Sequence, residues 1–469
     1  MSQHKLSRRK FVGQVSCAAL GYTSIMNSLI HLKGINALAA SSSMMDPQYK
    51  ALVCLMLSGG NDSYNMIVPM GNKEYNDYAK TRSNLALPKS ELLPIQVNNT
   101  PGRTFGLHPA LKGCQKMHED GKMVFVSNVG TLLEPTTKDG FYNNSVKLPL
   151  GLLSHSDQSI QWQSSLADKR STSGWGGRMS DLIRDMNSAT EISMNISLAG
   201  TNLYQTGNET IEFAIDPRYG SIGISGYRPD NTYDQFNILR TSAIDTLLDY
   251  EYKDIFQKTY IDVVRSSRDG HIKFTGALDK APTLQTQFTD NDISQAFNMI
   301  ARTISVHEDL GFKRQIFFVN FYGWDHHDEV LNNQNEMLGI VDGALLQFNA
   351  AMEELNLSNQ VTTFTASEFG RSLISNGNGT DHAWGGNAMV MGGAVNGKKI
   401  YGKFPLLASN SDLNVYDGIM IPTTSVDQYF AELALWMGVQ ASDLSYVLPN
   451  IGHFYDPNSG KAPIGFLKI

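Results

Sequence analysis

Short apolar runs that end abruptly in polar turns constrain the fold of this chain more than any other feature. A run without polar alternation is typical of a strand buried on both faces of a sheet. Segments of helical length separate several of the runs, which indicates βαβ units and a mostly parallel sheet. The predicted strands are 52–57, 123–126, 316–319, 361–365 and 389–391, and the predicted helices are 290–310, 329–355 and 427–437.

Composition narrows the class of protein. The 469 residues include 45 acidic and 38 basic side chains, a net charge of −7, which argues against a nucleic-acid surface. With 10% aromatic and only 18% charged residues, the chain is predicted to be folded. No run of about 18 apolar residues follows the first 45, so no membrane span is expected in the mature chain. We expect one α/β domain over 46–469, with an insertion or helical cap at about 200–285.

The N-terminus is typical of an export signal. Residues 7–12, SRRKFV, resemble the twin-arginine motif, a mildly apolar segment follows to about residue 30, and Ala37-Leu38-Ala39 offers a cleavage site. The alternative is an ordinary amphipathic helix. A signal peptide over 1–40 predicts a periplasmic or secreted protein, and the twin-arginine route usually carries proteins that fold before export, often with a metal or cofactor loaded.

Two cysteines, Cys54 and Cys114, follow the predicted cleavage site. Two in more than 400 residues do not make a disulfide scaffold, and a single bond between them is left open.

Acidic residues follow three of the predicted strands. Asp62 comes after the first, Asp325 after the third and Glu368 after the fourth. Ligands of parallel α/β sheets bind beyond the carboxyl ends of the strands, so these carboxylates are expected to converge. A single loop acid is more often only solvated or a helix cap, but the repeated position favours a site.

Histidines lie beside several acids. The pairs are Asp325-His326-His327 and Asp381-His382, and His155 lies in the segment SHSDQ at 154–158. Carboxylates and imidazoles together suit zinc or a related divalent ion. The alternative is a set of hydrogen-bonded polar loops. The chain has no H-E-x-x-H, C-x-x-C or G-x-S-x-G motif, which weakens zincin and α/β-hydrolase interpretations.

Eight short motifs are spread over nearly the whole mature chain: 57–69 (LSGGNDSYNMIVP), 107–111 (LHPAL), 154–158 (SHSDQ), 323–327 (GWDHH), 367–371 (SEFGR), 379–382 (GTDH), 392–395 (GGAV) and 401–402 (YG). Together, and in this order, they resemble the bacterial "domain of unknown function 1501" family. Three positions depart from the family pattern. His326 replaces the usual Thr, Ala383 replaces a Gly, and Ser63 stands where Gly is usual, which argues against Ser63 as a nucleophile.

The resemblance implies membership of the alkaline phosphatase and sulfatase superfamily. It implies a three-layer α/β/α sandwich with metal ligands at strand exits and a nucleophile near a helix start. The ligand candidates are then Asp62, Asp325, His327, Glu368, Asp381 and His382. Ser156 or Ser154, beside His155, is the candidate nucleophile, and a bound water is the alternative. Arg371 is expected either to hold a substrate oxyanion or to pair with a neighbouring acid.

Three functions compete at this point. The first is an exported metal-dependent hydrolase of phosphate or sulfate esters. The C-x-P-x-R motif of sulfatases is absent, which shifts weight towards phosphoesters. The second is an exported binding or assembly protein that keeps the fold without catalysis. The third is a Ser-His-Asp hydrolase built from residues 154–157, which is disfavoured because consecutive side chains rarely point at one another.

Overall fold

The computed structural model describes residues 48–188, 191–416 and 418–469. The predicted signal peptide lies outside these residues, so the twin-arginine assignment stays a prediction.

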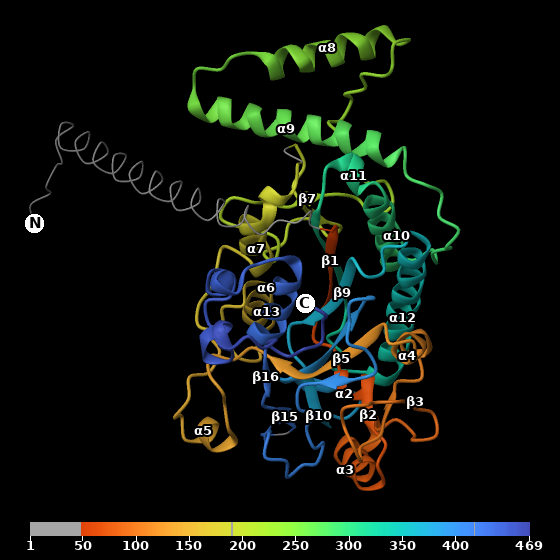
Figure 1. Cartoon of the computed structure of the whole chain (residues 1–469), viewed down its shortest axis with the longest axis vertical. Coiled ribbons are helices and arrows are strands. Elements are labelled where there is room, and N and C mark those ends of the chain that lie inside the picture. The colour runs from red at the N-terminus through yellow and green to blue at the C-terminus, as the bar shows by residue number, and fades with distance from the viewer. Residues whose placement is uncertain (1–47, 189–190, 417) are drawn as a thin grey trace, which may run out of the picture. The chain divides into compact units, whose positions relative to one another are not determined.

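A nine-stranded sheet forms the centre of the described chain (Figure 1). Its order is β13 (Ile400–Tyr401), β5 (Met123–Gly130), β12 (Gly386–Met391), β9 (Val361–Ser367), β1 (Lys50–Ser58), β8 (Arg314–Tyr322), β6 (Asn195–Ser197) and β7 (Phe213–Ala214), with β16 (Thr424–Ser425) also paired to β5. All of these strands run in one direction except β12, which is antiparallel to both neighbours. The five predicted strands are therefore confirmed as β1, β5, β8, β9 and β12, in a mostly parallel sheet.

Helices cover both faces of the sheet (Figure 1). One layer contains α4 (Lys112–Glu119), α10 (Asp292–Ser305) and α12 (Val330–Glu354), and the other contains α6 (His155–Ser164), α7 (Trp175–Ile183) and α13 (Val426–Met437). This is the expected three-layer α/β/α arrangement. The predicted helix at 290–310 is divided into α10 and α11 (His307–Leu310), and it ends at Gly311, whose φ of 79° is left-handed.

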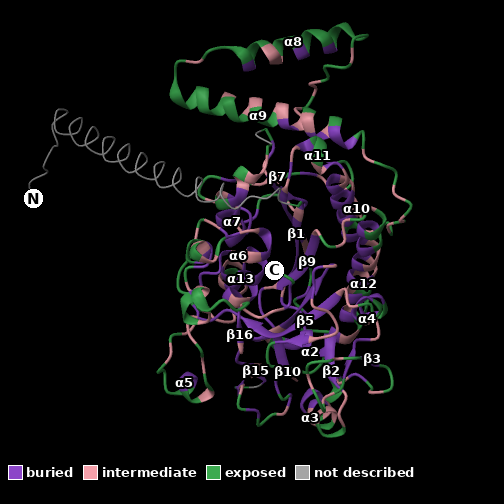
Figure 2. Cartoon of the chain, in the orientation of Figure 1, coloured by how far each residue is buried: buried purple, intermediate pink, exposed green. Residues whose placement is uncertain are grey.

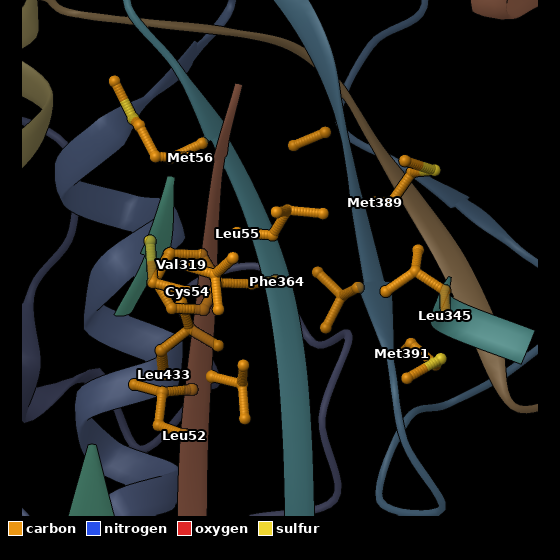
Figure 3. Packing of buried hydrophobic residues seen from close by; sticks show 14 of the residues in the cluster. Leu52, Cys54, Leu55, Met56, Val319, Leu345, Phe364, Met389, Met391 and Leu433 are labelled. Atoms are coloured by element: carbon orange, nitrogen blue, oxygen red, sulfur yellow. The ribbon is translucent and has the colours of Figure 1, made fainter. Parts of the chain in front are cut away.

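The central strands are apolar throughout because both of their faces are covered. Every residue of β1 after Lys50 is buried. Figure 3 shows Leu433 of α13 on the side of β1 to which Leu52 and Cys54 point, whereas Leu55 points to the other face. Side chains alternate along a strand, so an unbroken apolar run is what two covering layers require.

The segment at about 200–285 contains the pair of helices α8 (Gln235–Asp249) and α9 (Ile255–Leu278). Figure 2 shows most of their surface as exposed, in contrast to the helices against the sheet. No helix in the described parts of the chain is long and apolar enough to cross a bilayer. Cys54 and Cys114 are buried free thiols.

Candidate metal site

The carboxyl ends of β1, β8 and β9 meet at one edge of the sheet. Ser58 pairs with Tyr322, and Leu57 pairs with Ser367, so the loops after these three strands leave the sheet side by side. The backbone N–H of Trp324 donates to the carbonyl of Ser58 at 3.0 Å. Gly59 adopts a φ of 118°, and a Cβ there would lie 2.5 Å from the nitrogen of Asp325. A glycine is needed because the loop that carries Asp325 passes directly over it.

The carboxylate of Asp325 is the centre of the site. Its Oδ2 lies 3.3 Å from Nε2 of His155, and its Oδ1 lies 3.1 Å from Nε2 of His327 and 3.4 Å from Nε2 of His382. The Nε2 atoms of His327 and His382 are 3.0 Å apart. Three imidazoles from separate parts of the chain thus point the same ring atom at one acid.

The partner of each Nδ1 atom decides which nitrogen carries the proton. Nδ1 of His155 lies 2.5 Å from Oε2 of Glu368, Nδ1 of His327 lies 3.2 Å from Oδ1 of Asp381, and Nδ1 of His382 lies 2.8 Å from the carbonyl of Leu153. All three partners are acceptors, so a ring that donates through Nδ1 has the Nε2 lone pair available to bind a cation. The three Nε2 atoms all face the carboxylate of Asp325.

This donor set fits a zinc-like ion. Two atoms each about 2.0 Å from a tetrahedral zinc lie about 3.3 Å apart. The separations among Asp325, His327 and His382 are 3.0 to 3.4 Å. One ligand atom from each of His155, Asp325 and His382 lies within 4.8 Å of the others. Histidines anchored through Nδ1 by a carboxylate or carbonyl are the usual supporting arrangement of a protein metal site.

The charge states of these groups suit the same role. Burial lowers the pKa of His382, which favours the neutral ring that binds metals. Burial raises the pKa of Asp325, but the hydrogen bond and charge of Arg371, together with the nearby His155 and His327, outweigh it, and the pKa lies below the usual value. The carboxylate is therefore ionised at neutral pH.

The buried Arg371 links the loops that form the site. Its side chain is fully buried, and its guanidinium donates to the carbonyls of Gly60 at 3.0 Å, Thr380 at 3.0 Å and Gly59 at 2.6 Å. It also forms a short ion pair with Asp325. Of the two roles expected for Arg371, the structure favours the pairing with a neighbouring acid, because this guanidinium has no exposed face to offer a substrate.

Among the described contacts, Asp62 has none with Asp325 or the three histidines. Its buried carboxylate forms an ion pair with the equally buried Arg82, and Gln334 donates its side-chain amide to the backbone carbonyl of Asp62 at 2.5 Å. Its position after β1 was predicted, but Arg82, on α3 (Asn72–Arg82), already supplies a positive charge there. Sequence spacing gave no signal for this pairing, because Arg82 is one of three basic residues in the polar helix α3 and nothing distinguishes it from Lys73 and Lys80.

The two candidate serines lie at the start of α6. Ser154 is its N-cap and accepts from the backbone N–H of Asp157 at 3.4 Å, and its hydroxyl lies 3.2 Å from that of the exposed Ser156. The carboxylate of Asp157 pairs with Arg170 at 3.2 Å, while the ring of His155 faces Glu368 and Asp325. Residues 154–157 therefore do not form a Ser-His-Asp arrangement among their described contacts.

His155 was predicted to lie beside the candidate serines and was also counted among the histidines that suit a metal. Its ring contacts Asp325 and Glu368, so it lies among the ligand candidates. Glu368, which was expected to bind the metal, holds His155 in place, and Asp381 does the same for His327. The only sequence signal for His155 was the motif at 154–158. Its contact with Glu368 could not be predicted from local spacing, because the two residues are 213 positions apart.

Part of the chain matches a known family. Residues 278–445 match the model of "Protein of unknown function (DUF1501)". The matched part includes the segments at 323–327, 367–371 and 379–382, and those near 57, 107 and 154 lie before it. No curated protein matches the chain.

Solved structures with distant similarity include an alkaline phosphatase and a sulfatase. A variant of alkaline phosphatase PafA is 12% identical, with a TM-score of 0.29, and the match covers 70% of this chain and 64% of the phosphatase. The PsFucS1 sulfatase from Pseudoalteromonas sp. is 9% identical, with a TM-score of 0.31, covering 88% of this chain and 71% of the sulfatase. Scores of this size say nothing of activity, so the side-chain geometry alone supports the proposed function.

Proposed function

We propose that this protein is an exported metal-dependent hydrolase that acts on phosphate or sulfate esters. One observation supports the metal: the Nε2 atoms of His155, His327 and His382 converge on the carboxylate of Asp325, each ring being fixed through Nδ1. A divalent ion, zinc or a related metal, would satisfy such a donor set.

The chain's own groups have distinct roles in this proposal. Asp325, His155, His327 and His382 would hold the ion, and Glu368, Asp381 and the carbonyl of Leu153 orient the rings. When bound, a divalent ion supplies Lewis-acid polarisation of the ester and an activated water. Arg371 fixes Asp325 and the exit of β1, so the donors are arranged before substrate arrives. The site edge carries Asp325 and Asp381, and the guanidinium that contacts it, that of Arg371, is buried, so the ion would be the main attraction for an anionic ester.

The nucleophile is proposed to be a water or one of the two serines. Ser156 is exposed and adjacent to His155, which makes it the better serine candidate. Ser154 serves as the cap of α6. Replacing each with alanine separates these cases: loss of turnover in Ser156→Ala alone supports a covalent serine, and full activity in both variants supports water.

The alternative function is that of an exported binding protein with no catalysis. One observation favours it: none of the described hydrogen bonds of Ser154 or Ser156 reaches the rings or the carboxylate of the site.

Metal content and turnover test the proposal together. Purified protein is expected to contain about one equivalent of a divalent metal and to hydrolyse an aryl phosphate or an aryl sulfate. His382→Ala is expected to lose both, whereas His453→Ala, a change of an exposed histidine elsewhere, should lose neither. A metal-bearing but inert wild type would favour the binding protein, and a folded wild type that takes up no added zinc would end the metal proposal.

A further inference from the structure

Helix α8 exposes large apolar side chains, and two of its three buried residues, Asn237, Thr241 and Leu248, are polar. Phe236, Leu239 and Leu247 are 70%, 69% and 59% exposed, whereas Asn237 and Thr241 are buried. The inward face is held by polar contacts: Asn237 donates its side-chain amide to the carbonyl of Arg228 at 2.9 Å, and Thr241 accepts from its N–H at 3.2 Å. A helix that packs only on its own core buries most of its large apolar side chains, whereas Figure 2 shows α8 as mostly exposed.

The exposed apolar residues form one stripe. Phe236, Leu239, Ala243, Leu247 and Tyr250 follow one another at intervals of three or four residues, an average of 3.5. All five are exposed. This spacing is that of a helix that packs lengthwise against another helix. The partner expected for the stripe is therefore itself a helix.

The stripe is also symmetric about its centre. Ala243 is the middle residue, with a leucine four positions away on either side and an aromatic residue seven positions away on either side. If two copies of α8 lie antiparallel across a two-fold axis through Ala243, Phe236 faces Tyr250 and Leu239 faces Leu247 of the other copy. The small Ala243 at the axis lets the two backbones approach. Such self-complementarity is what an isologous interface requires.

Area and charge agree with this pairing. The apolar stripe, with Tyr233 just before the helix, exposes on the order of 700 Å² per copy, close to the roughly 800 Å² that each partner buries in a standard interface. Residues 231–278 carry seven acidic and six basic side chains. Two copies therefore do not repel strongly, and an anionic membrane is not attracted.

We propose that this protein forms a dimer in which α8 packs antiparallel on α8 of a second copy. The interface is separate from the metal site and stands independently of the proposed hydrolase activity. Sedimentation equilibrium of the wild type is expected to show a monomer–dimer equilibrium. Leu239→Glu, which puts two carboxylates into the stripe of the dimer, should weaken dimerisation by at least tenfold. Ser266→Glu, the same change of charge at an exposed position of α9, should leave it unchanged.

A cysteine at the axis tests the geometry itself. In Ala243→Cys the two introduced thiols would face each other, so mild oxidation is expected to give a disulfide-linked dimer. Ser266→Cys and the wild type should stay uncrosslinked under the same conditions. A wild type that is monomeric at every concentration overturns the proposal. If that monomer binds vesicles of neutral lipid, the apolar stripe is a membrane-binding surface instead. A dimer unaffected by Leu239→Glu, or one that Ser266→Cys crosslinks equally well, overturns the α8 interface.

Discussion

Single side chains decide how the candidate metal site is assembled. Glu368 is 7% exposed, and the contact of its carboxylate with Nδ1 of His155 determines which nitrogen of that ring faces Asp325. A carboxylate in this place raises the basicity of the ring and holds its orientation. In the proposed site, Glu368 would therefore act on a metal through His155.

Replacing Glu368 tests this positioning role. Glu368→Gln keeps the size of the side chain but loses its charge, so zinc affinity is expected to fall by about 10- to 100-fold while folding is retained. Competition with a chromogenic chelator measures the affinity. Glu336→Gln, on the exposed face of α12, is the matched control and should bind zinc as the wild type does. Equal affinity in both variants would contradict the role given to Glu368.

The buried pair of Asp62 and Arg82 makes a second prediction at this scale. Arg82→Met leaves the Asp62 carboxylate buried without its partner, which is expected to cost about 3–5 kcal/mol of the free energy of unfolding. The double variant with Asp62→Asn should recover part of that loss, since no charge is then stranded. Urea unfolding followed by circular dichroism measures both.

An exposed ion pair provides the comparison. Lys73, 85% exposed, pairs with Asp77 one turn further along α3, and Lys73→Met should change the stability by no more than about 1 kcal/mol. If Arg82→Met costs as little, the buried pair does not have the importance given to it here.

At the scale of elements, the antiparallel direction of β12 explains why the position of His382 at the sheet edge could not be predicted from strand ends. Acids placed after β8 and β9 were expected at the edge of the sheet because parallel strands end there, and Asp325 and Glu368 do lie there. His382 reaches the same edge by the opposite rule: it precedes β12, which begins there because it is antiparallel. The apolar run at 389–391 predicted a strand but gave no direction, since a strand buried on both faces reads the same either way.

Contacts between side chains far apart in the sequence could not be predicted either, because they depend on tertiary packing. His155 and Glu368, or Asp62 and Arg82, are joined only by the packing of α6 and α3 against strand ends. Local spacing carries no record of such contacts. By contrast, the strands and helices around the sheet follow from local apolar patterning, which is why their positions were predictable.

Helix α13 makes a prediction about pH. Asp427, in its first turn, is buried, and burial raises the pKa of its carboxyl to about 7, although hydrogen bonds such as that from Ser165 at 2.9 Å act against the rise. An acid whose pKa is higher when folded stabilises the protein below its unfolded pKa of about 3.9, and that stability is lost as the pH rises to about 7. The loss is on the order of 4 kcal/mol.

Asp427→Asn is expected to remove this dependence, because the amide oxygen can still accept from Ser165 and carries no charge. The free energy of unfolding of the variant, relative to the wild type, should therefore increase between pH 5 and pH 8. Urea titrations at several pH values give the difference, and two parallel curves would count against the buried acid.

At the scale of the whole molecule, export is the prediction that links the sequence to the site. A twin-arginine signal would carry this protein across a membrane after folding, so the metal could be loaded before export. Replacing both Arg8 and Arg9 with lysine is expected to retain the protein in the cytoplasm. Cell fractionation with antibody detection measures this, and Lys5→Arg serves as the control. Unchanged export of the double variant would exclude the twin-arginine route.

The antiparallel direction of β12 affects how a site at this sheet edge can evolve. Donors reach the sheet edge both from segments that leave it and from the β10–β11 ribbon (Arg371–Ser375 and Thr380–His382) that returns to it. Arg371 and His382 are paired neighbours on that one ribbon. Exchange of a single stretch of about a dozen residues would therefore replace both the arginine that binds Asp325 and the candidate ligand His382. The metal preference of the proposed site would then change across related proteins while the parallel strands beneath it stay as they are.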